Sequence, residues 1–578
     1  MRRRLWQLSC APLLAFVSLS SARKPPVNVT FPESAPANGN VVDDNFLGIS
    51  WELSAVPSLW GDDPQAIPDA LQNYLANIRA RMSNTLRMRV GGNSMDSSVY
   101  DPNQSEMIIL TDPDAYFNDV PTSIGPSLFD VMNAMSSCVG GMEYIIGLSM
   151  QDPSNATNVL QLASAAETKL GGLLDAMTLG NEPDLYAGHG TRTNYTISDY
   201  IPEINEVFDA MENSPYGNLV PEPILAGPTI CCSWNLSDVL TAGMAQLSYK
   251  YYTLQHYPTY VCAGQTDASG NISYYISHVN VAPFLSWQTE GMQMAKNQNV
   301  PVLLTEYNTA SCGGDPRVAP TFAATLWAVD VALKAAQLNY SAVYLHTREL
   351  GITYNLFEPT STDLTSPDWQ TGSPYYATLV VAELLSNLSS VIVDLNINNS
   401  TTNSSSTVAA YGVYDSPMRY RSKLVLFNFN YPKNSSVTPN TTAQTFVLPP
   451  NLADSVDVRL LHAPNISEQT NISWAGQTVQ SNGELQPSDR QLTHSFACHE
   501  GCEIEVPGPG LALVWLDPDE QAGQIYFGDS TVAPIKSSSN TTSTTSSSSP
   551  SIRADPFSYF LFPLLAAVLS TYVVHSLL

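Results

Sequence analysis

The chain has 578 residues, of which 44% are hydrophobic and only 13% are charged. This composition excludes a disordered chain, and the length is sufficient for a sizeable buried core. Its 24 Lys and Arg against 52 Asp and Glu give a net charge of −28, which argues against nucleic-acid partners and against docking on acidic membranes or sulfated polysaccharides through basic clusters.

The N-terminus has the pattern of a secretory signal peptide. The chain starts Met-Arg-Arg-Arg, continues with an apolar run from Leu5 to Leu19, and then has Ser-Ser-Ala. A charged start, a short apolar segment and small residues are typical of a signal that is removed, and the run is too short to favour a membrane anchor. We therefore expect residues 1–22 to be a signal peptide.

Short apolar segments alternate with helical patterns over the next part of the chain. We predict strands at Phe46–Glu52, Thr85–Val90, Met142–Leu148, Asp175–Gly180, Ile224–Ala226, Tyr251–His256, Val302–Thr305 and Ala342–Leu345. We predict helices at Pro68–Arg81, Ser127–Met135, Val159–Leu170, Ile201–Met211, Leu236–Gln246, Val279–Lys296 and Phe322–Gln337. Such alternation implies parallel strands joined by crossover helices, so residues 42–385 predict a (β/α)8 TIM barrel within the α/β class. An open doubly wound sheet is the alternative, but no Gly-X-Gly-X-X-Gly follows any of these strands.

The pattern changes to short β-type runs after about residue 388. We predict strands at Val391–Leu395, Thr407–Tyr414, Lys423–Asn428, Thr445–Leu448, Val456–Leu460, Ser495–Ala497 and Leu511–Trp515. Turn-forming residues between them favour a C-terminal antiparallel β-sandwich domain over residues 388–530. The segment 27–41 also has strand character, and we expect it to pair into the same sandwich.

The C-terminus has the pattern of a lipid-anchor signal. Residues 537–550 are almost entirely Ser, Thr and Asn, and no charged residue follows Asp555. We expect residues 537–555 to be an O-glycosylated stalk with the anchor site, and residues 556–578 to be the hydrophobic anchor signal. A plain transmembrane anchor is the alternative. Sequons such as Asn28-Val-Thr and Asn155-Ala-Thr agree with a secreted, GPI-anchored glycoprotein at the cell surface.

The chain has eight cysteines, of which seven remain after removal of the signal peptide. Secretion permits disulfides, and an odd number leaves at least one thiol free or paired between chains. We expect Cys498 and Cys502 to form a local bridge, and we do not expect the adjacent Cys231 and Cys232 to pair with each other. Because no cysteine or histidine group has zinc spacing, we expect no metal and no cofactor.

Two glutamates follow predicted barrel strands directly. Glu182 lies in Gly-Asn-Glu-Pro-Asp-Leu-Tyr after the fourth strand, and Glu306 lies in Leu-Thr-Glu-Tyr-Asn after the seventh. Residues at the carboxyl ends of barrel strands line the catalytic mouth. Two carboxyl groups there suit glycoside hydrolysis, with retention of configuration at a separation of about 5–5.5 Å and inversion at a wider one. A single Glu in such a place can also be a helix-start residue or a loop charge.

These motifs, with Arg-Val-Gly-Gly-Asn at Arg89–Asn93 and the C-terminal β domain, resemble glycoside hydrolase family 79 in the clan of retaining (β/α)8 glycosidases. The resemblance covers residues 27–516. It implies that Glu182 is the acid/base, that Glu306 is the nucleophile, and that the activity is that of a β-glucuronidase.

Further residues gain roles from this resemblance and from their places after strands. Tyr257 would hydrogen-bond the nucleophile, or else be a core aromatic. Asn181 would contact the sugar 2-hydroxyl. Glu52 would bind sugar hydroxyls, or else be a buried acid paired with Arg89.

A glucuronide also needs a site for its own carboxylate. No Lys or Arg lies beside either motif except Arg317. Backbone N–H groups of Gly313 and Gly314 and the phenol of Tyr354 are the candidate donors, unless the two glycines form only a flexible turn.

We therefore expect a monomeric, exo-acting hydrolase of β-glucuronide-bearing glycans or small glucuronides. Few basic residues argue against sulfated substrates. The alternatives are an endo-acting hydrolase of uronate polysaccharides and a non-catalytic cell-surface protein that binds glycans.

Overall fold

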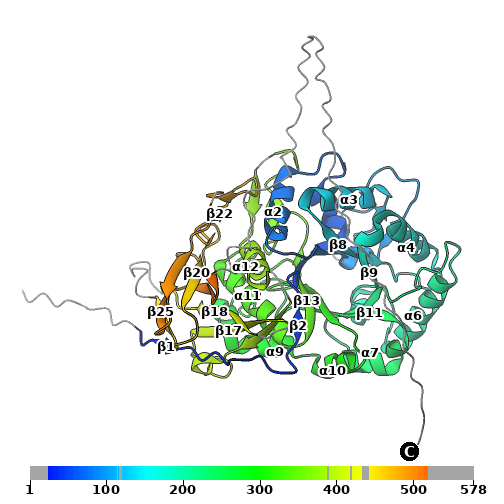
Figure 1. The fold of residues 1–578 in the computed structure, drawn as a ribbon. Helices are drawn as coiled ribbons and strands as arrows, with labels where there is room; N and C mark the ends of the chain where they lie inside the picture. Colours follow the sequence, from blue (N-terminus) through cyan, green and yellow to red (C-terminus); the bar gives the residue numbers. More distant parts are fainter. Residues whose placement is uncertain are drawn as a thin grey trace, which may run out of the picture. The chain divides into compact units, whose positions relative to one another are not determined.

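Eight parallel strands close into a barrel in the computed structural model (Figure 1). They are β3 (Leu47–Glu52), β4 (Leu86–Gly91), β8 (Met142–Leu148), β9 (Leu174–Leu179), β10 (Leu225–Ile230), β11 (Tyr249–His256), β12 (Val302–Tyr307) and β13 (Tyr340–Thr347). The last strand pairs with the first, with Val343 opposite Leu47, which closes the sheet. Each predicted strand corresponds to one of these, so the barrel prediction is confirmed.

The structure describes residues 24–113, 115, 120–366, 368–386, 389–416, 420–432, 442–488 and 490–518. The predicted signal peptide, stalk and anchor signal lie outside these residues. Within them, no helix combines the length and the hydropathy needed to span a bilayer.

Helices connect the barrel strands and cover their outer side. They are α1 (Val56–Trp60), α2 (Asp69–Arg79), α3 (Ser127–Val139), α4 (Thr157–Leu170), α5 (Tyr186–His189), α6 (Ile197–Glu212), α7 (Leu236–Ala242), α8 (Ile272–Tyr275), α9 (Val281–Leu285), α10 (Thr289–Asn297), α11 (Phe322–Gln337) and α12 (Tyr375–Leu385). Small sheets decorate the connections: β5 (Ser98–Tyr100), β6 (Ile108–Leu110) and β7 (Thr122–Ile124); β14 (Phe357–Pro359) and β15 (Trp369–Thr371); β22 (Thr478–Val479) and β23 (Leu485–Gln486).

One helix prediction was incorrect, and helix α12 was missed. The single helix predicted for Val279–Lys296 is broken between α9 and α10. In the break, the Gln288 side chain accepts a hydrogen bond from the Leu236 N–H at 2.6 Å and donates one to the Trp234 carbonyl at 3.0 Å, so it serves the N-terminus of α7 instead of continuing a helix. Helix α12 was not predicted, because it is buried on every side and has no amphipathic periodicity.

The C-terminal strands form two sheets with an apolar core between them. The larger sheet runs in the order β2 (Val41–Val42), β16 (Ser390–Asp394), β17 (Val408–Asp415), β18 (Arg421–Asn428), β26 (Gly510–Trp515), β20 (Ser455–His462) and β21 (Ser473–Trp474), with β24 (His494–Ala497) also on β20. The smaller sheet consists of β1 (Val27–Asn28), β19 (Gln444–Leu448) and β25 (Cys502–Val506). The N-terminal strands β1 and β2 pair with β19 and β16, so this segment belongs to the β domain in the structure.

Helices α11 and α12 lie between the barrel and the larger sheet (Figure 1). Helix α11 packs on β13, on α12 and on β16, and residues 322–336 are all buried. One continuous apolar core therefore runs from the barrel through these helices into the inner face of the sheet.

Three disulfides are present among the described residues: Cys231–Cys232, Cys262–Cys312 and Cys498–Cys502. The expected local bridge at Cys498–Cys502 forms. The expectation that Cys231 and Cys232 do not pair was wrong: their sulfurs are bonded in the turn after β10, where the backbone N–H groups of both residues donate to the Asp184 carboxylate.

Candidate active site

Glu182 and Glu306 both lie at the carboxyl ends of barrel strands. Glu306 is on β12 and is 8% exposed. Glu182 follows β9 and precedes a short 3-10 helix (Pro183–Leu185), with a left-handed backbone at φ 49°. Its N–H donates to the Thr229 carbonyl at 3.2 Å, and its carbonyl accepts from the Leu185 N–H at 2.8 Å. Left-handed backbone is uncommon for a residue with a Cβ and is retained where neighbouring contacts fix it.

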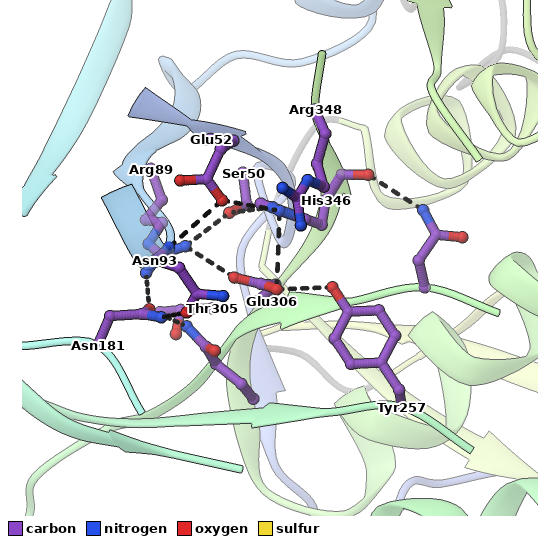
Figure 2. Close-up of polar contacts among 12 residues, drawn as sticks. Ser50, Glu52, Arg89, Asn93, Asn181, Tyr257, Thr305, Glu306, His346 and Arg348 are labelled. Carbon is purple, nitrogen blue, oxygen red and sulfur yellow. Dashed lines mark hydrogen bonds and ion pairs between the residues drawn. The ribbon is translucent and has the colours of Figure 1, made fainter. Parts of the chain in front are cut away.

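Two donors hold the Glu306 carboxylate (Figure 2). Arg89 Nη1 donates to Oε2 at 3.0 Å, and the Tyr257 hydroxyl donates to Oε1 at 2.7 Å. Each donor binds a different oxygen, so the two hydrogen bonds fix the orientation of the Glu306 carboxyl group. The structure thus gives Tyr257 the contact that the resemblance implies.

Arg89 on β4 connects the two glutamate motifs. It is fully buried, and its Nη2 donates to Asn181 Oδ1 at 2.6 Å while its Nη1 also reaches Ser50 Oγ at 3.2 Å. Asn181 Oδ1 receives a second bond from Gln255 Nε2 at 2.8 Å. Asn181 Nδ2 donates to Asn93 Oδ1 at 2.7 Å, so the orientation of this amide is fixed from several sides.

Glu52 at the end of β3 is buried at 1% exposure. Its carboxylate accepts hydrogen bonds from the Ser94 N–H at 2.9 Å, from the Ser94 hydroxyl and from the Asn93 N–H at 3.3 Å. A Cβ at Gly92 would lie 2.2 Å from Glu52 Oε2, and Gly92 has φ +76°, so this close approach requires glycine. The observed contacts fasten the loop after β4 to the end of β3.

The electrostatics of the two glutamates differ. Burial, and next the charge of Glu306, raise the pKa of Glu182 well above its ordinary value. Asp184 and Glu52 add to this rise, while Arg89 opposes it. Because the charge of Glu306 acts on Glu182, the two carboxyl groups belong to one site, and the raised pKa favours the protonated form of Glu182.

Two buried side chains at the carboxyl end of the eighth strand, His346 and Arg348, were not among the predicted site residues. His346 lies within 3.7 Å of Glu306 Oε1 and 3.8 Å of Glu52 Oε2, and its Nδ1 contacts Ser50 Oγ at 3.1 Å. Burial lowers the pKa of His346 well below its ordinary value, so the ring is neutral. Arg348 is 4% exposed and donates to Glu349 Oε2 at 3.1 Å. Both residues stand at the carboxyl end of a predicted barrel strand, and this position was the feature of the sequence that could have identified them.

The Gly313–Gly314 segment is a constrained loop. Positive φ angles at Cys312, Gly313 and Gly314 (63°, 105° and 79°) form a bend next to the Cys262–Cys312 disulfide. The Gly313 carbonyl accepts from the Thr353 N–H at 3.1 Å and from its hydroxyl at 2.8 Å. A Cβ on Gly314 would lie 2.8 Å from Thr353 Oγ1, which leaves no space for another residue type.

Tyr354 follows the Thr353 contact and is buried at 1% exposure. Its ring centroid lies 6.2 Å from that of His346, whose Nε2 is 3.7 Å from Glu306 Oε1. Arg317, in contrast, pairs with Asp315 at 2.9 Å and donates to the Thr266 carbonyl at 2.5 Å, so its charge is already compensated.

Comparison with protein families and curated proteins supports the resemblance. Residues 410–513 match the glycosyl hydrolase family 79 C-terminal beta domain. A beta-glucuronidase of Aspergillus niger is 27% identical over 518 residues, which cover 82% of this chain and 90% of the relative. A beta-glucuronidase of Neurospora crassa is 25% identical over 64% of this chain and 68% of the relative.

Solved structures share the fold. A 4-O-alpha-L-rhamnosyl-beta-D-glucuronidase of Fusarium oxysporum superposes with a TM-score of 0.69 at 21% identity, covering 85% of this chain and all of that chain. An alpha-L-arabinofuranosidase of Thermotoga maritima superposes with a TM-score of 0.56 at 13% identity, covering 85% and 99%. With the barrel, the two glutamates and these relatives together, the chain is a glycoside hydrolase that resembles family 79 and carries that family's C-terminal β domain.

Proposed function

We propose that the chain is a retaining exo-β-glucuronidase, with Glu306 as the nucleophile and Glu182 as the acid/base. The observation that carries this proposal is the different surroundings of the two residues. The Glu306 carboxyl group accepts hydrogen bonds from Arg89 and Tyr257, whereas burial and the Glu306 charge raise the pKa of Glu182. The two curated relatives, both named beta-glucuronidase, support glucuronides as the substrate class.

The reaction then proceeds in two displacements. In the first, a Glu306 oxygen attacks the anomeric carbon, the glycosidic C–O bond breaks, and the Glu182 proton passes to the leaving oxygen. The product is a glycosyl ester on Glu306 and a Glu182 carboxylate. In the second, Glu182 takes a proton from water, the water oxygen attacks the same carbon, and Glu306 leaves as a carboxylate. Two inversions give net retention.

Neighbouring side chains orient the pair. Arg89 and Tyr257 each donate to one carboxylate oxygen of Glu306, so the carboxyl group is oriented before substrate binds. Asn181, whose amide is fixed by Arg89 and Asn93, is proposed to donate to the sugar 2-hydroxyl. Glu52 is proposed to act as a positioning residue for the Asn93 loop rather than to contact sugar.

The carboxylate of glucuronic acid needs donors in a protein with net charge −28. We propose the backbone N–H groups of Gly313 and Gly314 and the Tyr354 hydroxyl as these donors. The buried guanidinium of Arg348, which interacts electrostatically with Tyr354, adds positive potential on this side. Arg317 does not supply it, because it is paired with Asp315.

Release of 4-nitrophenol from its β-glucuronide tests the proposal. On this substrate we expect Glu306→Ala to lower kcat/KM by about 10³-fold or more. On an alkyl β-glucuronide, whose leaving group needs the proton, we expect Glu182→Ala to lower kcat/KM to a similar extent. Glu212→Ala, at an exposed position of α6, is expected to leave both values unchanged. Comparable turnover of a β-glucoside would overturn the specificity. On glucuronide oligosaccharides, exo action releases single glucuronic acid residues, whereas internal fragments would indicate endo action.

We also propose that the chain is secreted and held at the cell surface by a lipid anchor, and that it acts as a monomer. The signal-like N-terminus, the Ser/Thr tract and the apolar tail support the anchor. Phosphatidylinositol-specific phospholipase C is expected to release the activity from intact cells, and the released enzyme is expected to elute as a monomer. Activity that stays with the membrane after this treatment would indicate a transmembrane anchor instead.

A further inference from the structure

The Cys231–Cys232 disulfide lies at the carboxyl end of β10, between the strand that leads to Glu182 and the strand that leads to Tyr257. Cys231 is buried and Cys232 is exposed. A disulfide between adjacent residues closes a small ring that includes the peptide bond joining them, and it therefore restricts the backbone torsions on both sides. Nothing in the two-displacement reaction requires it, so its position calls for a separate explanation.

One contact connects this turn with Glu182. The carboxylate of Asp184, two residues after Glu182, accepts hydrogen bonds from three consecutive backbone N–H groups, those of Cys231 at 3.2 Å, Cys232 at 2.8 Å and Ser233 at 2.7 Å. Three N–H groups converge on one carboxylate only when the backbone is sharply bent. Asp184 is 9% exposed, and its charge contributes to the raised pKa of Glu182.

A second contact connects the turn with the opposite glutamate. The His256 ring hydrogen-bonds the Cys231 backbone, and burial lowers the pKa of His256 to about 4, so the ring is neutral. The ring stacks on Trp287 with centroids 4.5 Å apart. His256 directly precedes Tyr257, whose hydroxyl is bonded to Glu306. The turn thus has the acid/base segment on one side and the nucleophile's partner on the other.

We propose that the Cys231–Cys232 disulfide is a positioning element for the general acid: it holds the bend that fixes Asp184, and through Asp184 it fixes Glu182 on the aglycone side of the site. This inference rests on the proposed function, because it assigns Glu182 the proton transfer to the leaving group. A displacement of about 1 Å in a reacting group lowers rates by up to about a hundredfold, so a bend held by a covalent ring has kinetic consequences.

The expected signature depends on the leaving group. A nitrophenolate leaves without help from an acid, whereas an alkyl or sugar alkoxide needs the proton. Loss of the disulfide is therefore expected to lower kcat/KM for alkyl β-glucuronides about ten- to a hundredfold and to change kcat/KM for 4-nitrophenyl β-glucuronide less than about threefold. A disulfide that only stabilised the fold would not distinguish between the two substrates.

The experiment compares Cys231→Ser/Cys232→Ser with the wild-type enzyme on both substrates. Cys498→Ser/Cys502→Ser, which removes the bridge in the β domain, is the matched control. It is expected to leave kcat/KM unchanged for both the alkyl and the 4-nitrophenyl β-glucuronide. Asp184→Ala is expected to reproduce the leaving-group effect, and its combination with the cysteine pair is expected to add no further loss, since both changes break the same connection. Peptide mapping of the wild-type enzyme checks that the two cysteines are bonded to each other.

Several results would overturn the inference. These are free thiols at both cysteines of the wild-type enzyme, equal losses on the two substrates, or unchanged rates on both. If the double serine variant does not fold, Asp184→Ala alone decides between these outcomes. Failure of the proposed function looks different: the wild-type enzyme then releases no glucuronic acid, or Glu182→Ala retains full activity on the alkyl glucuronide.

Discussion

Arg89 contacts both glutamate motifs, a role that the sequence did not predict. A guanidinium that is fully buried destabilises the fold unless it is paired, and here its partners are Glu306, Asn181 and Ser50. These contacts hold the Glu306 carboxyl group and fix the amide that precedes Glu182. One cation inside the barrel thus orients parts of both glutamate motifs.

Removal of the Tyr257 hydroxyl tests how much the orientation of Glu306 matters. Tyr257→Phe removes a 2.7 Å bond to a charged oxygen, which is worth about 1.5–3 kcal/mol, so we expect kcat/KM to fall about ten- to a hundredfold while the unfolding temperature changes little. Steady-state kinetics on the 4-nitrophenyl substrate measure it. Tyr216→Phe, at a position that is 51% exposed, is the matched control. Wild-type kcat/KM in Tyr257→Phe would show that this hydrogen bond does not contribute to catalysis.

The pH dependence follows from the raised pKa of Glu182. In the proposed mechanism the active form carries the proton on Glu182. Because the folded pKa lies above the ordinary 4.5, this form persists into less acidic solution and is lost as pH rises through the raised pKa. We expect kcat/KM for an alkyl β-glucuronide to decline on the alkaline side above pH 4.5. The residual rate of Glu182→Gln on the same substrate is expected to lack this decline, and an unchanged alkaline limb in that variant would assign it to another residue.

The residues of the site were only partly predictable. Asn181, Glu182 and Tyr257 follow strands, and Glu306 lies near the carboxyl end of β12. The apolar runs of these strands are plain in the sequence, so the barrel rule places the four residues at the mouth. Arg89, Gln255 and His346 lie within strands, and which of them point inward depends on register and on bulges such as the one between Leu254 and Gln255. A single sequence does not carry that information.

At the scale of elements, apolar runs predicted strands well and helices unevenly. Helix α11 was predicted with its true limits, whereas α12, buried on every side, had no polar stripe to mark it. Strand β25 was missed because its exposed positions carry Glu503 and Glu505 in an otherwise short run. Tertiary contacts, which the sequence does not display, decide such cases.

A buried ion cluster joins the barrel helices to the larger sheet. His278 bonds Asp330 on α11 and Asp394 on β16, each at 2.9 Å, and Lys334 on α11 also bonds Asp394. Breaking a buried pair leaves a charge uncompensated, so Asp394→Asn is expected to lower the free energy of unfolding by about 3 kcal/mol. Denaturant unfolding measures it, with Asp130→Asn in the half-exposed Lys169 pair as the control, expected to cost below about 1 kcal/mol.

The effect of Asp394→Asn depends on pH. Burial alone lowers the pKa of His278, but Asp330 and Asp394 outweigh it and raise that pKa from 6.5 to about 9. The stabilisation by His278 is therefore complete below pH 6.5 and is lost as pH rises through about 9.

Burial alone raises the pKa of Asp394, but His278 and Lys334 lower it from 3.8 to about 2. Its contribution is present above pH 3.8 and is lost toward pH 2, so the stability difference is expected to be largest between these limits, near pH 4–6.5. A difference that grows above pH 9 would contradict this assignment.

For the whole molecule, the net charge of −28 opposes an anionic substrate. Raising the ionic strength from about 0.01 M to about 0.15 M shortens the Debye length from about 30 Å to about 8 Å. We expect KM for 4-nitrophenyl β-glucuronide to fall by about two- to threefold over this range with little change in kcat. The uncharged methyl ester of the same substrate is the control, and a KM that rises with salt would indicate a basic approach to the site.

Covalent trapping tests the central claim most directly. A 2-deoxy-2-fluoro glucuronide with an activated leaving group slows both displacements and lets the glycosyl-enzyme accumulate, so that peptide mapping identifies the residue that carries the sugar. We expect one label per chain, on Glu306, and β-configured glucuronic acid as the first product of the normal substrate. A label on any other residue, or an α-configured first product without a label, would contradict it.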